Sequence, residues 1–203
     1  MSCISIGNFI SLNDIPKLLD CETINELKEK AKAGVNNEII QSLHWTGGRY
    51  RQVANNYHIC ILGDGRMVYT LPFYETPTAT YLRNSGTIAI SLCCCYNANS
   101  NDLGDYPPTL QQIESISQLV SKISDVLKIP ITPFSVMTHG EMADREDGIG
   151  NYTEYGPKNT CERWDLEFLD TEESPNFNPW DTLHRGGTII RGKAIYYHYH
   201  SLL

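Results

Sequence analysis

Short apolar runs, separated by helical patterns, constrain the fold of this chain more than any other feature. Runs rich in β-branched and large apolar side chains are typical of buried strands, and they occupy residues 38–45, 87–96 and 134–139. Residues 56–71 add two such runs joined by Gly-Asp-Gly, which predicts a β-hairpin. Because strands alternate with helices and the hairpin adds antiparallel pairing, the sequence predicts an α/β fold with a mixed central sheet flanked by helices.

Two segments show the three- and four-residue spacing of amphipathic helices. Residues 14–33 are predicted to be helical, with Thr23 as the N-cap and Gly34 as the stop. A second helix is predicted to begin at Pro108 and to turn one apolar stripe toward the core. The stripe consists of Leu110, Ile113, Ile116, Leu119, Val120, Ile123 and Leu127. Residues 186–200 predict a short helix or strand near the end of the chain.

The length of 203 residues is enough for one domain with a substantial core. We expect an N-terminal helical extension over residues 1–36 and a single catalytic domain over residues 37–203. The last third of that domain is predicted to be rich in loops, because Gly, Pro, Asn and acidic residues dominate residues 140–178.

Charge, hydropathy and cysteine usage narrow the class of protein. The net charge of −8 argues against a nucleic-acid partner, because phosphate binding needs surplus Lys and Arg. The absence of an eighteen-residue apolar run predicts no membrane span, and the N-terminus lacks the basic and long apolar regions of a secretory signal. Seven cysteines, three of them consecutive at 93–95, form no regular framework and are predicted to be reduced. We therefore expect synthesis in a reducing cytoplasm.

Three polar residues, far apart in sequence, form a candidate metal site. His44 and His139 each end an apolar run that is predicted to be a strand, and Asp165 lies in the loop-rich part of the chain. Two neutral imidazoles and a carboxylate, with one coordination position left for water, are the ligand set of a hydrolytic zinc site. Either histidine could equally be hydrogen-bonded within the core. Cys161 competes with Asp165 as the third ligand, because thiolates also bind zinc.

The order of the motifs resembles a known family. LHWTGG, the hairpin NYHICILGDGRMVY, the run TIAISL, the helix TLQQIESISQLV, VMTHGEMA and RWD follow one another along the chain. This order is similar to that of the zinc-dependent N-acetylmuramoyl-L-alanine amidases, which share their fold with bacteriophage amidase-type lysozymes and peptidoglycan recognition proteins. The resemblance extends from about Ile39 to Asp165 and is closest to the phage or prophage type.

The resemblance also implies roles for individual residues. The zinc ligands it implies are His44, His139 and Asp165. It implies catalytic roles for Tyr57, near the metal, and for Arg163, which stands where the family usually has lysine. Glu141 is expected either to steer an imidazole or to stabilise a helix start. Leu166 and Glu167 replace the usual Pro-Gly, so we expect the last loop to take a different course.

The implied activity is hydrolysis of the amide between N-acetylmuramic acid and the L-alanine of the peptidoglycan stem, with a bound Zn²⁺ ion. The enzyme would reach the cell wall by holin-type release, secretion or delivery from a virion. One alternative is a non-catalytic peptidoglycan-binding protein of the same fold. Another is a zinc amidase that acts on soluble muropeptides or as an antibacterial effector.

Overall fold

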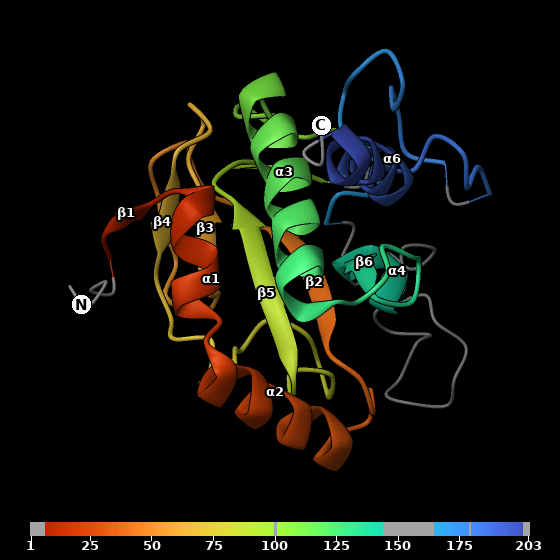
Figure 1. Ribbon diagram of the computed structural model, residues 1–203. Coiled ribbons are helices and arrows are strands. Elements are labelled where there is room, and N and C mark those ends of the chain that lie inside the picture. The colour runs from red at the N-terminus through yellow and green to blue at the C-terminus, as the bar shows by residue number, and fades with distance from the viewer. Residues whose placement is uncertain (1–6, 100, 144–164, 179, 201–203) are drawn as a thin grey trace.

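The computed structural model describes residues 7–99, 101–143, 165–178 and 180–200. At its centre lies a six-stranded sheet with the order β1-β4-β3-β5-β2-β6 (Figure 1). The strands are β1 (Phe9–Ile10), β2 (Ile40–Trp45), β3 (Ile59–Ile61), β4 (Met67–Tyr69), β5 (Thr87–Leu92) and β6 (Val136–Thr138). Pairing is parallel from β3 through β5 and β2 to β6, whereas β4 runs antiparallel to β1 and β3. This mixed sheet in a single domain confirms the predicted fold class.

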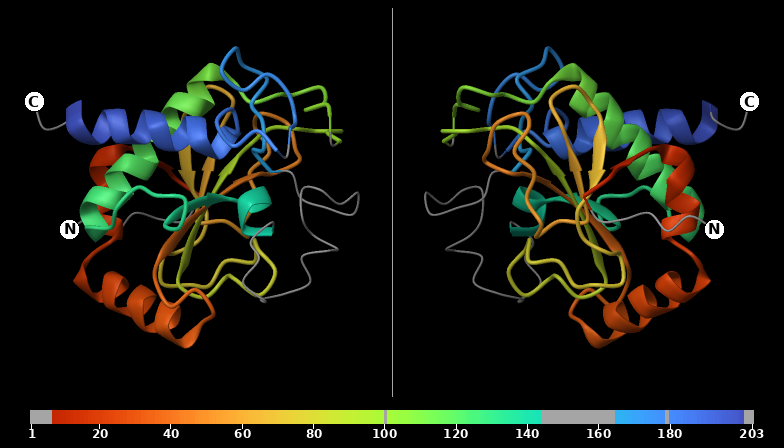
Figure 2. Two further views of the ribbon diagram at one scale, coloured as in Figure 1. Left: turned by 90° about the vertical axis from the view of Figure 1, so that its right-hand side faces the viewer. Right: turned by 90° about the vertical axis from the view of Figure 1, so that its left-hand side faces the viewer.

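Helices α1, α3 and α6 lie on one side of the sheet (Figure 2). The helices are α1 (Ile15–Leu18), α2 (Cys21–Ala33), α3 (Leu110–Leu127), α4 (His139–Ala143) and α6 (Gly186–His200), and a 3-10 turn covers Leu12–Asp14. Helix α3 packs on β3 and β5, and α6 packs along α3. Residues 186–200, which were predicted to form a short helix or strand, form helix α6. Across the described ranges, no helix is long and apolar enough to cross a membrane.

Two predicted helix starts are wrong by one or more residues. The N-cap of α2 is Asp20, whose carboxylate accepts a hydrogen bond from the backbone N–H of Thr23, so Thr23 lies inside the helix. Helix α3 begins after Thr109 rather than at Pro108, because the Thr109 hydroxyl accepts a backbone N–H of the first turn. In both cases a side-chain oxygen satisfies an N–H that has no partner within the helix. Gly34 ends α2 as predicted.

The core contains most of the predicted apolar stripe of α3. Six of its seven members are buried, and they are Ile113, Ile116, Leu119, Val120, Ile123 and Leu127. Leu110 is 69% exposed, which corrects the prediction for this residue. At about 100° per residue, Leu110 lies roughly a third of a turn from the centre of the stripe. All six residues of β5 are buried, as expected for a strand covered on both faces.

The sheet register explains why the two predicted histidine ligands meet. Strands β2 and β6 are parallel neighbours, and Leu43 pairs with Thr138. The next residue in each segment is a histidine, so His44 and His139 reach the same carboxyl edge at the same level. Binding sites of α/β sheets characteristically lie at this edge.

Candidate metal centre

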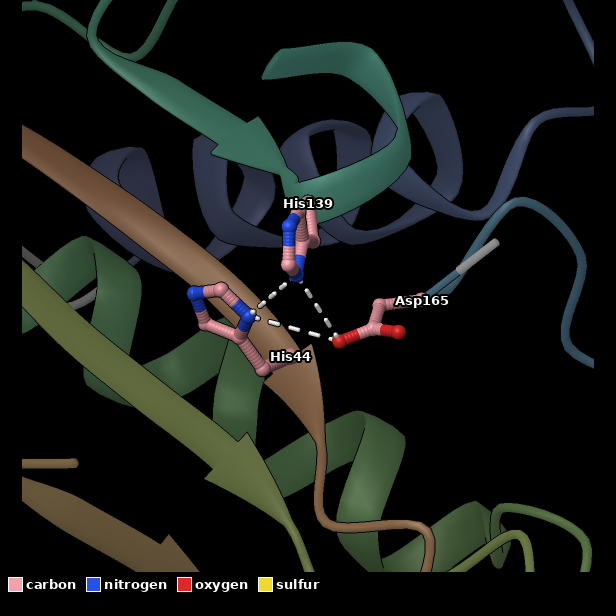
Figure 3. A group of neighbouring side chains, drawn as sticks. All are labelled: His44, His139 and Asp165. Atoms are coloured by element: carbon pink, nitrogen blue, oxygen red, sulfur yellow. Dashed lines mark hydrogen bonds and ion pairs between the residues drawn. The ribbon is translucent and has the colours of Figure 1, made fainter. Parts of the chain in front are cut away.

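Three buried side chains point toward one another at the carboxyl edge of the sheet (Figure 3). His44 lies near the end of β2, His139 begins α4 directly after β6, and Asp165 lies in a turn. The Nδ1 atom of His44 is 3.2 Å from Nδ1 of His139 and 3.4 Å from Oδ2 of Asp165. Nδ1 of His139 is 3.3 Å from the same Oδ2. The structure therefore brings together the three residues that were predicted to be ligands.

The spacing of these three atoms suits one small cation. Ligand atoms about 2.0–2.1 Å from a tetrahedral zinc ion lie about 3.3 Å from each other. The measured separations of 3.2, 3.3 and 3.4 Å match that value. Two ring nitrogens this close must share a proton or a cation, because two lone pairs repel each other. Two imidazoles and one carboxylate are also a donor set of catalytic zinc sites, in which a fourth position stays open.

Ser42 orients the ring of His44. Its Oγ lies 3.0 Å from Nε2 of His44, the ring nitrogen that does not face His139. A proton on Nε2, donated to this hydroxyl, leaves the Nδ1 lone pair available for a metal. Ser42 and His44 are two residues apart in β2 and so share one face of the sheet. Sequence reasoning missed Ser42, although the alternation of a strand was the signal that could have found it.

The electrostatics of the centre favour a charged carboxylate. Burial would raise the pKa of Asp165, but the charges and hydrogen bonds of His139 and His44 outweigh burial and hold the pKa below its usual range. Asp165 is therefore ionised at neutral pH, which a carboxylate metal ligand requires.

Of the predicted catalytic residues, Tyr57 lies beside the centre. Its ring centroid is 5.2 Å from that of His44, and its hydroxyl donates a hydrogen bond to the carbonyl oxygen of Trp45 at 3.4 Å. Arg163, the other predicted catalytic residue, lies outside the described residues. The same holds for Cys161, the competing third ligand.

The two glutamates near the ligands form largely buried ion pairs that sequence reasoning did not predict. Glu141 accepts the backbone N–H of Thr138 at 2.9 Å and pairs with Arg191, so it stabilises a helix start. Glu167 pairs with Arg185. Burial raises the pKa of Glu167 to about 7, and Arg185 opposes that rise. No short-range sequence pattern connects these partners, because they are separated by 50 and 18 residues.

His58 packs away from the centre. It is fully buried and stacks on Phe73, with 5.3 Å between the ring centroids. Its Nδ1 accepts the N–H of Ala89 at 3.0 Å, and its Nε2 donates to the carbonyl oxygen of Glu75 at 3.1 Å. Burial lowers the pKa of His58 to about 4, and the positive charge of Lys30 acts in the same direction.

We predict that His58 makes the protein less stable in mild acid. Its pKa is about 4 in the folded protein and about 6.5 in the unfolded chain, so below pH 6.5 the unfolded chain takes up the proton first. The free energy of unfolding should fall by about 3 kcal/mol between pH 7 and pH 4 from this group alone. Urea unfolding at several pH values, with a chelator present, measures this loss. The His58→Gln variant should lack this component, and an equally steep curve for it would refute the assignment.

Comparisons with known proteins show the family to which this chain belongs. A family model described as N-acetylmuramoyl-L-alanine amidase matches residues 22–152, more than half of the chain. A comparison with curated protein sequences finds no match. The chain is similar to the solved structure of the Ph2119 endolysin from Thermus scotoductus MAT2119 bacteriophage Ph2119, with 16% identity and a TM-score of 0.41 over 56% of this chain and 79% of that one. It is also similar to the amidase endolysin LysCS from Clostridium intestinale URNW, with 18% identity and a TM-score of 0.41 over 59% of this chain and 80% of that one. On the strength of the family match, this chain belongs to the N-acetylmuramoyl-L-alanine amidase family.

Proposed function

We propose that this protein is a zinc-dependent amidase that cleaves the bond between N-acetylmuramic acid and the L-alanine of the peptidoglycan stem. Membership of the amidase family supports the substrate class. The observation that carries the zinc dependence is the buried triangle of His44, His139 and Asp165, whose ligand atoms lie 3.2–3.4 Å apart. The site of action that follows from this substrate is the bacterial cell wall.

The three ligands suit catalysis better than a purely structural role. Structural zinc sites have four protein ligands, whereas hydrolytic sites have three and leave one position for water or substrate. When zinc is bound, it supplies a Lewis acid that activates water at neutral pH and polarises the scissile carbonyl. His44 and His139 would bind it as neutral imidazoles, and Asp165 would contribute the negative charge.

Two further side chains complete the proposed mechanism. Tyr57, which lies beside His44, would orient the attacking water and assist proton transfer to the leaving amine. The role of Arg163 rests on the resemblance in sequence. Its guanidinium would stabilise the oxyanion of the tetrahedral intermediate by about 3 kcal/mol.

The test of this function is digestion of purified peptidoglycan with and without a chelator, followed by mass analysis of the products. We expect free stem peptides that begin with L-alanine, intact glycan strands, and no reaction in the chelator. New reducing sugar ends or cuts within the stem would contradict the proposed specificity. Binding to peptidoglycan without any released peptide would instead indicate a non-catalytic binding protein.

A further inference from the structure

We propose that two largely buried arginines around the start of α6 position the metal ligands, an inference that rests on the proposed zinc site. Each arginine binds a glutamate that follows a proposed ligand by two residues. The four side chains, which we call the arginine brace, are Arg185, Glu167, Arg191 and Glu141. Three of them lie beyond the residues 22–152 that the family model matches.

The first arm of the brace holds the segment around His139. Nη1 and Nη2 of Arg191 donate to the two carboxylate oxygens of Glu141 at 2.7 and 2.8 Å, and Nη1 also donates to the carbonyl oxygen of Val136 at 3.0 Å. Glu141 in turn accepts the backbone N–H of Thr138. Arg191 therefore connects α6 to two elements next to His139. One is β6, which ends just before His139, and the other is α4, which begins at His139.

The second arm joins the segment of Asp165 to that of His139. Nε of Arg185 donates to one carboxylate oxygen of Glu167 at 2.7 Å, and the other oxygen accepts the hydroxyl of Thr138 at 3.2 Å. The backbone N–H of Gly186 also donates to the carbonyl oxygen of Glu167 at 3.0 Å. Thr138 is thus bound by both glutamates of the brace, and it directly precedes His139.

Close packing and backbone conformation show how tightly the second arm is built. A Cβ atom on Gly140 would lie 2.3 Å from Oε1 of Glu167, so only glycine lets the carboxylate come this near. Leu166, between Asp165 and Glu167, has a φ of 62°, which is unfavourable for a residue with a side chain. Such a conformation persists only where surrounding contacts fix it. The bonds of Glu167, which directly follows Leu166 and lies two residues after Asp165, supply such contacts.

Stability alone does not account for these ion pairs. Buried ion pairs contribute little net stability compared with apolar side chains of similar volume, because both charges lose their water. Helix α6 also has separate attachments to α3, where Lys193 donates to Glu114 at 2.6 Å and Tyr197 donates to the same carboxylate. The brace differs from these attachments because its two glutamates lie two residues after the proposed ligands His139 and Asp165. Groups that orient metal ligands in this way tune metal affinity.

The experiment compares zinc affinity in Arg185→Lys, Arg191→Lys and the unaltered protein by competition with a chromophoric chelator. Lysine keeps the charge but loses the planar fork that binds two acceptors. We expect each variant to bind zinc about 10- to 100-fold more weakly. The visible absorption of the cobalt(II)-loaded protein should also change, since it reports ligand geometry. The matched control is Lys193→Gln, which removes an ion pair of the same helix and should leave zinc affinity and cobalt absorption unchanged.

A second measurement needs no variant. Coupling between the brace and the metal is reciprocal, so zinc added to the unaltered protein should slow amide hydrogen exchange at residues 185–191. If zinc does not change the rate of amide exchange at these residues, the inference is overturned. This result counts even if the lysine variants do not fold. If the lysine variants fold and bind zinc with unaltered affinity, the positioning role of the arginines is overturned. The proposed zinc site is not affected by that result. An unaltered protein that retains no zinc would overturn the proposed function together with this inference.

Discussion

Replacing His139 by alanine should remove zinc from the protein and abolish amidase activity while leaving the chain folded. His139 contributes one of three converging ligand atoms. Catalytic zinc sites have three protein ligands, so the two that remain bind the ion too weakly to retain it. The loss of zinc affinity should exceed the roughly 100-fold effect that is typical of residues outside the coordination shell. Zinc content after dialysis, activity on peptidoglycan and circular dichroism measure the three parts of this result.

The matched control for this variant is His200→Ala. His200 lies in the last turn of α6, is exposed, and stacks on Tyr196 rather than on any proposed ligand. It should keep full zinc content and activity. Unchanged zinc stoichiometry in His139→Ala would show that the ion, if one binds, is held elsewhere.

Replacing Tyr57 by phenylalanine should lower kcat by about 100-fold or more, the range for one acid–base group. The variant keeps the ring that lies 5.2 Å from His44 and removes only the hydroxyl. KM and zinc content should therefore stay the same. Steady-state kinetics on a soluble muropeptide, together with zinc analysis, separates a loss of chemistry from a loss of metal.

Tyr50→Phe serves as the matched control for Tyr57→Phe. The Tyr50 hydroxyl donates to the carbonyl oxygen of Pro107 at 2.8 Å and takes no part in the proposed chemistry. Its removal should leave kcat unchanged. A Tyr57→Phe enzyme as active as this control would exclude the hydroxyl from the mechanism.

The strands of the sheet and the two histidine ligands were accessible from local sequence patterns, whereas Asp165 was predicted from the resemblance to the amidase family. The run at 38–45 and the run at 134–139 each end in histidine, and parallel pairing of β2 with β6 brings these ends together. The hairpin at 56–71 was visible in its Gly-Asp-Gly turn, and it forms β3 and β4. In these cases a few neighbouring residues indicate the strand or the turn, and the sheet then brings distant strands together.

Other features depended on contacts between distant segments and could not be predicted. Strand β1 has two residues, and its structure depends on antiparallel pairing with β4, which is distant in sequence. The partners of Glu141 and Glu167 were invisible because their arginines come from the region around α6, far along the chain. The cap of α2 was misjudged by three residues, since Asp20 and Thr23 are both good caps and the choice depends on where the preceding turn ends.

The most direct test of the account is diffraction at the zinc absorption edge from crystals of the zinc-loaded protein. We predict one anomalous peak about 2.0–2.1 Å from Nδ1 of His44, Nδ1 of His139 and a carboxylate oxygen of Asp165. A zinc ion coordinated by Cys161 in place of Asp165 would contradict the assignment of Asp165 as the third ligand. A fully loaded protein whose zinc lies away from both histidines would contradict the metal centre as a whole.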